Sequence, residues 1–257
     1  MKKIFFPLIV IVLLLSACNL TVVSGSGKII NSSRPVSGFT RLTFDVPGEL
    51  TLTQSDKESL SITGDDNLLD HIKSEVINGE LRIYTEPEDV ILDPSKPIRY
   101  SLSVKTLDQV VLNGSGSITA ANFKGKQFAL KLNGSGSVNF GSLQSTALDF
   151  DLNGSGGVNV TSLSADALRA TVNGSGKFSL KGKATHQNVS ILGSGEYDAR
   201  SLESAQAEIS VSGSGESQVW ATETMNVSIL GSGSVGYLGK PKVTQQVAGS
   251  GNIYSLE

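Results

Sequence analysis

Cysteine, histidine and charged residues are all scarce in this chain of 257 residues. The single cysteine excludes an intramolecular disulfide and any cysteine-cluster metal site. Two histidines leave little material for a zinc site or a histidine-based triad. Charged residues make up 18% of the sequence, against about 25% in an average domain, and the net charge is -3. We therefore expect no nucleic-acid partner, because the basic surface that nucleic acids require is missing.

The first eighteen residues are typical of an exported lipoprotein. Lys2 and Lys3 precede an apolar stretch over 4–15, which is too short to span a bilayer of about 30 Å but fits a signal peptide. The stretch ends in Leu-Ser-Ala-Cys, which resembles the lipobox of bacterial lipoproteins. The resemblance implies a signal peptide over 1–17 and lipidation of Cys18. The alternative is an ordinary signal peptide with an unrelated cysteine. The Ser-, Gly- and Asn-rich composition from there to residue 38 predicts a tether, in which 22–23 and 28–30 are candidates for a short strand.

The residue after the cysteine bears on the destination of the protein. By resemblance to lipoprotein sorting in Gram-negative bacteria, Asn19 lacks the aspartate that retains lipoproteins in the inner membrane. We therefore expect a lipid-anchored protein of the outer membrane. In a Gram-positive host the same signal would leave it on the cytoplasmic membrane.

A repeat of about twenty residues is the most informative feature. The tripeptide Gly-Ser-Gly recurs at spacings of 20, 20, 20, 19, 20, 18 and 18 residues. Its copies begin at Gly114, Gly134, Gly154, Gly174, Gly193, Gly213, Gly231 and Gly249. Two stretches of alternating apolar and polar residues lie between copies, and neither can bury its apolar side alone. The pattern predicts an all-β, right-handed parallel β-helix-like solenoid with rungs of about 20 residues.

The segment before the repeats is irregular but also rich in strand signals. Asn78-Gly79 between alternating stretches predicts a hairpin, and Asp65 to Asn67 predicts the acidic cap of a short helix. The Pro-rich stretch 86–97 is expected to be a loop. This segment is either the start of the same solenoid or a small domain packed on its end. We place the solenoid domain at 39–257, with the irregular part at 39–112 and the repeats at 113–257.

Several stretches together resemble a known bacterial family. They are Ser37 to Phe39, Phe44 to Leu52, Asp66 to Leu69, Asn78 to Ile83, and the serial Asn-Gly-Ser-Gly-Ser turns. This combination resembles the "putative auto-transporter adhesin, head GIN domain" family over about residues 37–257. The resemblance implies an exported β-helix-like domain that is common in lipoproteins of Gram-negative bacteria.

Two glycine-rich motifs of other families are excluded by their context. Gly231 to Gly236 matches the G-x-G-x-x-G dinucleotide pattern, but no helix follows it, so we expect no nucleotide and no cofactor. Calcium-binding β-rolls repeat every nine residues with an aspartate in each turn, and no Gly-Ser-Gly turn here contains one. We therefore expect no metal site.

Charged side chains of neighbouring repeats provide the main argument for an enzyme. Polysaccharide-active β-helix enzymes need carboxylates and basic groups on one face, and Lys131, Asp149, Asp151 and Arg169 are the candidates. Ion pairing between rungs on a solvated face explains them more simply, so we assign no catalytic residue. A second, acidic patch is predicted without a basic partner nearby. Its members are Glu196, Asp198 and Glu216.

Aromatic side chains in the last rungs are the weak candidates for a ligand surface. They are Trp220, Tyr237 and Tyr254, whereas Tyr197 falls in an inward column and is expected in the core. We therefore predict a non-catalytic, lipid-anchored module of the cell envelope that acts as an adhesin-like binder or scaffold. Its expected partners are the membrane, through Cys18, and a glycan or a surface protein. The alternatives are a polysaccharide-active enzyme and a structural or stress-response component of the envelope.

Overall fold

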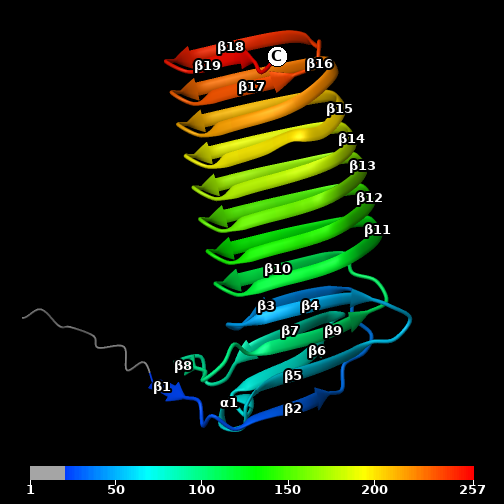
Figure 1. The fold of residues 1–257 in the computed structure, drawn as a ribbon, viewed down its shortest axis with the longest axis vertical. Coiled ribbons are helices and arrows are strands. Elements are labelled where there is room, and N and C mark those ends of the chain that lie inside the picture. Colours follow the sequence, from blue (N-terminus) through cyan, green and yellow to red (C-terminus); the bar gives the residue numbers. More distant parts are fainter. Residues whose placement is uncertain (1–20) are drawn as a thin grey trace, which may run out of the picture.

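The computed structural model describes residues 21–257 as a β-solenoid of about 7 turns with rungs of about 20 residues (Figure 1). Strands make up 75% of it and helix 2%, so the predicted all-β solenoid is confirmed. The predicted signal peptide and Cys18 lie outside the described residues. Within the described part, no helix has the length and apolarity needed to cross a bilayer.

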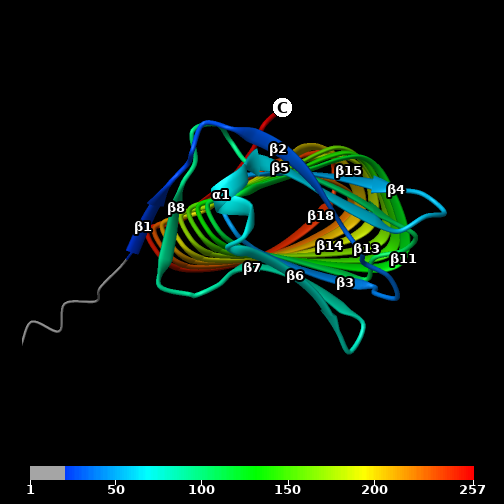
Figure 2. The ribbon, with the colours of Figure 1, turned by 90° about the horizontal axis from the view of Figure 1, so that it is seen from below.

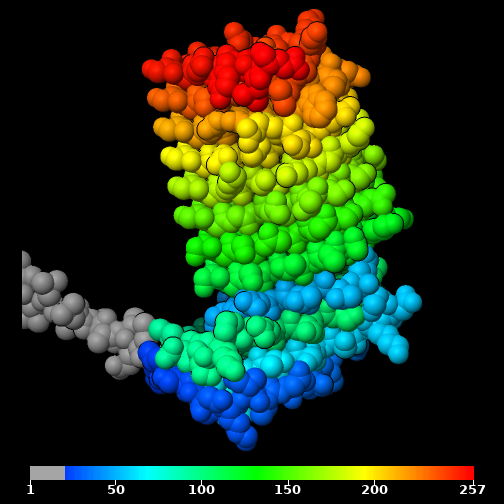
Figure 3. All heavy atoms as spheres, in the orientation of Figure 1, coloured from blue at the N-terminus to red at the C-terminus, as the bar shows by residue number. Residues whose placement is uncertain are grey.

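Six long strands form the regular rungs, and each follows the chain around most of one turn. They are β11 (Ser117–Gly134), β12 (Ser137–Gly154), β13 (Gly157–Gly174), β14 (Lys177–Gly193), β15 (Glu196–Gly213) and β16 (Glu216–Gly231). Successive rungs pair in parallel, so Ile118 lies opposite Val138 and Val138 opposite Val158. The next rung is divided into β17 (Ser234–Leu238) and β18 (Lys242–Gly249), and β19 (Asn252–Ser255) begins one more rung by pairing with β17. In the space-filling view the rungs appear as stacked layers (Figure 3).

The irregular N-terminal segment begins the same solenoid and is not a separate domain. Its rung strands are β3 (Arg41–Asp45), β4 (Glu49–Gln54), β7 (Glu80–Thr85), β9 (Arg99–Val104) and β10 (Gln109–Gly114). β3 pairs in parallel with both β7 and β10, and β4 pairs in parallel with both β9 and β11. The rung of β3 and β4 therefore lies between two rungs that come later in the chain.

Antiparallel strands cover the N-terminal end of the stack. They are β2 (Ile29–Arg34), β5 (Ser59–Asp65) and β6 (Ile72–Ile77), which pair with β5, β9 and β7 respectively. Seen along the stack, β2 and the short helix α1 (Asp66–Leu69) lie across this end (Figure 2). The predicted hairpin turn is confirmed, with positive φ at Asn78 (51°) and Gly79 (75°). These antiparallel strands cover the backbone N–H and C=O groups that the first rung would otherwise expose at the end of the stack.

Two segments differ from their predictions. A small parallel pair joins β1 (Thr21–Ser24) to β8 (Val90–Asp93). Strands β1 and β2 therefore lie within the predicted tether, ahead of the predicted domain start at Phe39. The predicted loop 86–97 likewise contains β8, whose partner lies about seventy residues earlier in the sequence.

The core fills the space between the two sides of each turn. The inward columns are fully buried, and Phe150 and Tyr197 are both 0% exposed, as the alternating pattern predicts. Phe150 and Phe178 stack across the interior with ring centroids 6.1 Å apart, and Phe178 packs edge-on against Tyr197 at 6.2 Å. The interior is therefore packed with side chains and leaves the outer faces for any ligand.

The Gly-Ser-Gly turns combine a special backbone angle with close packing between rungs. The first glycine of each turn has a positive φ, which is 129° at Gly154. The shorter repeats keep this turn, since φ is still 124° at Gly231 and 125° at Gly249. The Gly-Ser-Gly corner is therefore not reshaped in the shorter repeats. The first 18-residue repeat is shorter than the 20-residue repeat before it at the opposite corner, where the register between β15 and β16 shifts between Ala199 and Glu203.

A ladder of asparagine side chains follows the first four turns. Asn133, Asn153 and Asn173 each donate from Nδ2 to Oδ1 of the asparagine in the preceding rung, at 2.9, 2.9 and 2.7 Å. The ladder begins at Asn113 and fixes the register of these rungs in the same way as amide ladders in stacked sheets.

Asp65 connects three segments of the N-terminal cap. Its carboxylate accepts hydrogen bonds from Gly27 N (2.8 Å), Ser95 Oγ (2.6 Å) and Ser95 N (2.9 Å), and the side chain is 0% exposed. The predicted helix is confirmed, with Asp65 at its N-cap position and Asp66 in its first turn, but the Asp65 side chain makes no capping hydrogen bond to α1. The pKa of Asp65 lies below its ordinary value, and the hydrogen bond from the Ser95 hydroxyl contributes most to this lowering.

Asp65→Asn should lower the melting temperature at pH 7, because an amide cannot accept all three bonds and brings its own donors against them. The pKa of Asp65 is lower in the folded state than in the unfolded chain, where it is about 3.9. The charged carboxylate therefore stabilises the fold fully above that pH, and this stabilisation is lost as the pH falls through the pKa of the folded state. The difference in melting temperature between wild type and variant should therefore narrow below about pH 4. Asp166→Asn, at an exposed position of β13, is the control. A difference that stays constant from pH 7 down to about pH 2 would contradict this role.

Candidate binding surfaces

Two columns of outward side chains on β11 to β16 border a hollow of about 1110 Å³. Parallel register continues each column from rung to rung. The first column contains Gln127, Ala147, Ala167, His186, Gln206 and Thr224. The second contains Ala129, Asp149, Arg169, Asn188, Glu208 and Asn226. We call this hollow the axial trough. Its six rungs, at a strand spacing of about 4.8 Å, extend it for about 24 Å along the solenoid.

The charges in the axial trough lie in an exposed, paired arrangement. Arg169 Nε and Asp149 Oδ1 are 3.9 Å apart, and their side chains are 69% and 56% exposed. Asn188 Nδ2 donates to Glu208 Oε2 at 3.1 Å. The predicted ion pair between rungs is therefore confirmed for Arg169 and Asp149. Solvated pairs of this kind have little effect on stability.

The other two members of the enzyme hypothesis lie beside the trough. Lys131 and Asp151 are opposite one another in adjacent rungs, but they are absent from the ion pairs found within residues 21–257. Asp149 borders the open trough at an exposed position of β12, and Asp151 points outward beside it from a half-buried position. The four side chains therefore share a face, as the sequence predicts, without converging on a protected reaction centre.

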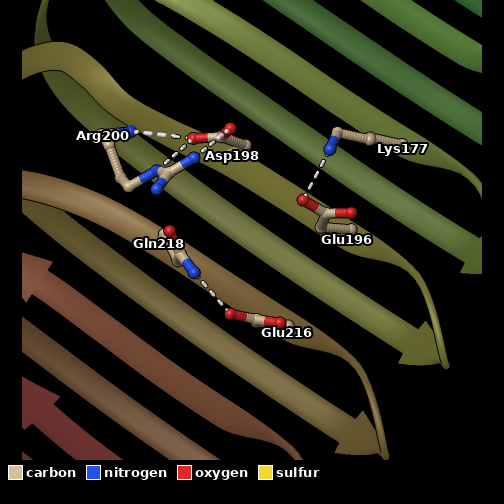
Figure 4. Close-up of polar contacts among 6 residues, drawn as sticks. All are labelled: Lys177, Glu196, Asp198, Arg200, Glu216 and Gln218. Atoms are coloured by element: carbon tan, nitrogen blue, oxygen red, sulfur yellow. Dashed lines mark hydrogen bonds and ion pairs between the residues drawn. The ribbon is translucent and has the colours of Figure 1, made fainter.

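The predicted acidic patch is correct in position and wrong in its lack of basic partners. Figure 4 shows Glu196, Asp198 and Glu216 on neighbouring rungs. Lys177 Nζ donates to Glu196 Oε1 at 2.7 Å, and Arg200 binds Asp198 through Nε and Nη2, each at 3.0 Å. Both basic residues come from the same face of the solenoid. Lys177 lies on β14, one rung away from its partner Glu196 on β15, so the sequence around Glu196 does not reveal the pair.

The third carboxylate of this patch has an amide partner. Gln218 Nε2 donates to Glu216, as Figure 4 shows, while Gln218 Oε1 is buried and lacks a hydrogen-bond partner among the described residues. A second hollow, of about 440 Å³, lies beside Arg200 and is lined also by Ser179, Lys181 and Leu238. This hollow is smaller than the axial trough and spans fewer rungs.

The shifted carboxyl groups are all held in the charged form. Hydrogen bonding from Arg200 holds the pKa of Asp198 below its ordinary value, and the pKa of Asp65 and of Asp66 is lowered as well. A general acid needs the opposite, a carboxyl whose pKa is raised towards neutrality. These groups are therefore suited to ion pairing and structure.

The three aromatic candidates lie in different settings. Tyr237 continues the inward column of Val219 and packs against the core, whereas Trp220 lies at a corner opposite Glu203. Tyr254 lies opposite Gly236 on the outer face, where a Cβ at that glycine would lie 3.2 Å from its ring. None of the three lines the axial trough or the second hollow. Their role in binding stays a prediction.

Comparison with known proteins supports the resemblance seen in the sequence. Residues 38–241 match the family model described as "Putative auto-transporter adhesin, head GIN domain". A solved structure described as a putative lipid binding protein from Parabacteroides distasonis is 28% identical, with a TM-score of 0.87. One described as a putative adhesin from Parabacteroides merdae is 25% identical, with a TM-score of 0.88. Each alignment covers 92% of this chain and 100% of the other. No curated protein matches the chain.

Proposed function

Because the chain belongs to the putative auto-transporter adhesin, head GIN domain family, we propose that it is a lipid-anchored, adhesin-like binding module of the cell envelope that works without catalysis. The axial trough is the observation that carries this proposal, since it gives a continuous binding surface across six rungs. The exposed ion pair of Arg169 and Asp149, and the lowered pKa of Asp198, support binding rather than acid–base chemistry.

The anchor gives this surface a defined orientation. The proposed lipid at Cys18 precedes β1 and β2, which lie at the capped end of the stack (Figure 1). The trough runs along the stack and away from that end, so the protein would hold it out from the membrane. We propose the outer membrane of a Gram-negative bacterium as the site, from Asn19 after the anchor.

Cys18→Ala should move the protein from the membrane fraction to the soluble or uncleaved pool, because it removes the site of lipidation. The measurement is fractionation of cells followed by immunoblotting and mass analysis of the N-terminus. Asn19→Ala, one residue away, should leave membrane retention unchanged. Full membrane retention and normal processing of Cys18→Ala would contradict the proposed anchor.

Binding itself can be measured with beads coated with the purified mature chain. The beads are offered to intact cells of the producing bacterium, to isolated cell-wall sacculi and to a mucin-coated surface, with albumin-coated beads as the control. The proposal predicts retention on at least one of these surfaces. Retention no greater than that of albumin on all of them would contradict an adhesin-like function.

A further inference from the structure

The axial trough has the features expected for one class of ligand. Small side chains open its middle, where Ala147 and Ala167 lie side by side in adjacent rungs. Amides and hydroxyls lie along both columns towards the C-terminal rungs, among them Gln206, Thr224 and Asn226. A chain molecule with apolar faces and many hydroxyl groups can use both kinds of surface along the same line.

Hydrogen-bonding capacity is available in the trough. Within residues 21–257 the side chains of Gln127, Gln206 and Asn226 are without hydrogen-bond partners, and each is exposed. An amide offers two donor hydrogens and an acceptor oxygen, which suits a ligand hydroxyl that both donates and accepts. The rungs follow one another at about 4.8 Å along the axis, so one extended polymer can reach amides at both ends of the trough while its middle units lie over Ala147 and Ala167.

Charge in the trough favours a neutral ligand. Five charged side chains line it, namely Asp108, Lys126, Asp149, Arg169 and Glu208. Three are acidic and two are basic, so one negative charge is left, and Arg169 is already 3.9 Å from Asp149. A polyanion such as a polyuronate or a nucleic acid would meet this small negative excess without a basic stripe to offset it.

A peptide partner fits the trough less well than a glycan. Peptides commonly bind β-proteins by adding a strand to a free sheet edge. The strands β12 to β15 beneath the trough are paired in parallel on both sides, so their backbone groups are already satisfied. Recognition there must come from side chains, which is how the hydroxyls of a sugar chain are bound.

We infer that the axial trough binds a neutral glycan chain lying parallel to the solenoid axis. This inference rests on the proposed function and names the ligand class of the same surface. The exposed Ala167, at the centre of the trough, is the position where added bulk blocks such a chain. Thr171 lies four residues further along β13 on the same outward side and outside the trough, so it provides a matched control.

Titration calorimetry of the mature chain with separate soluble polysaccharides tests the inference. Dextran, a mannan and an arabinoxylan are the neutral probes, and polygalacturonate and heparin are the acidic ones. We expect at least one neutral probe to bind, Ala167→Trp to weaken its binding by at least about tenfold, and Thr171→Trp to leave it unchanged. The double variant Asn188→Ala with Gln206→Ala, which adds no bulk, should also weaken it. Circular dichroism confirms that each variant is folded.

Three results would overturn the inference. They are binding of the acidic probes alone, neutral binding that persists in Ala167→Trp, and no binding of any polysaccharide. The bead assay with natural surfaces separates these results from failure of the proposed function. Beads that are retained while every neutral polysaccharide fails would leave an adhesin-like module whose ligand is of another class.

Discussion

Gly154→Val should destabilise the solenoid by at least about 2 kcal/mol, because two independent features of this turn exclude a side chain. The φ of Gly154 is +129°, a region that β-branched residues do not adopt without strain. A Cβ there would also overlap the carbonyl oxygen of Gly134 in the rung below. That oxygen accepts the backbone N–H of Ser155 at 3.0 Å, so moving it breaks the contact between rungs. Urea unfolding monitored by circular dichroism gives the free energy.

The same rung provides matched controls for this prediction. Gly157 begins β13 with an ordinary φ, and a Cβ there would meet only the carbonyl oxygen of Lys177, at 3.8 Å. Ser137 and Lys177 occupy the same column in the neighbouring rungs. Gly157→Val should therefore change stability by less than about 1 kcal/mol, and Ser155→Ala should be as mild. Equal costs for Gly154→Val and Gly157→Val would show that the turn does not require glycine.

Phe150→Ala should cost about 3–5 kcal/mol, because it removes a fully buried ring from the centre of the stack. The column above offers little to fill the space, since Phe150 lies opposite Ala170 in the next rung. Its stacking contact with Phe178 across the interior would be lost as well. The measurement is again the free energy of unfolding in urea.

A conservative change at the same position separates packing from other causes. Phe150→Leu keeps most of the volume and should cost less than about 1.5 kcal/mol. Because Phe150 is buried, neither change should alter the axial trough directly. A cost below about 1 kcal/mol for Phe150→Ala would mean that the core around it is not packed as the structure shows.

The repeating part of the fold can be predicted from the sequence because each rung repeats the same local rules. Alternation places Phe150 and Tyr197 inside, and glycine at Gly154 supplies an angle that few other residues can adopt. Register follows from the near-constant spacing of the turns, since a slip of one residue would turn every apolar side chain outward. These features depend on neighbours within about twenty residues.

The N-terminal part depends on contacts that are distant in sequence, and local patterns contain less information about it. The order in which β3 and β7 stack cannot be read from their alternation, because either arrangement buries the same residues. Asp65 has the appearance of a helix cap, but Gly27 and Ser95 use its carboxylate from segments thirty or more residues away.

Buried polar groups of the core show a similar limit. Gln187 takes the place of the inward Leu168 of the preceding rung and is 2% exposed. Its Oε1 accepts from the Tyr197 hydroxyl at 2.8 Å, and its Nε2 donates to Ser204 Oγ at 2.8 Å. An inward glutamine contradicts simple alternation. Only the rungs that stack on it show why the position is stable, since each polar atom has a partner.

The candidate surfaces were partly predictable. The shared face of Asp149 and Arg169 follows from the repeat, because parallel register places equivalent positions side by side. The depth of the trough depends on small residues such as Ala167 in a bent strand, and no sequence motif marks them. Arg200, which the sequence leaves out of the acidic patch, reaches Asp198 on its own strand.

The most direct test of the account compares two tryptophan variants in the bead assay. Beads coated with each variant are offered to the surface that retains the wild-type protein, and the fraction retained is measured. Ala167→Trp fills the axial trough, whereas Thr171→Trp places the same bulk outside it on the same strand. The account predicts that Ala167→Trp abolishes retention and that Thr171→Trp keeps it at the wild-type level. Equal retention of both variants would contradict the claim that this protein binds through the trough.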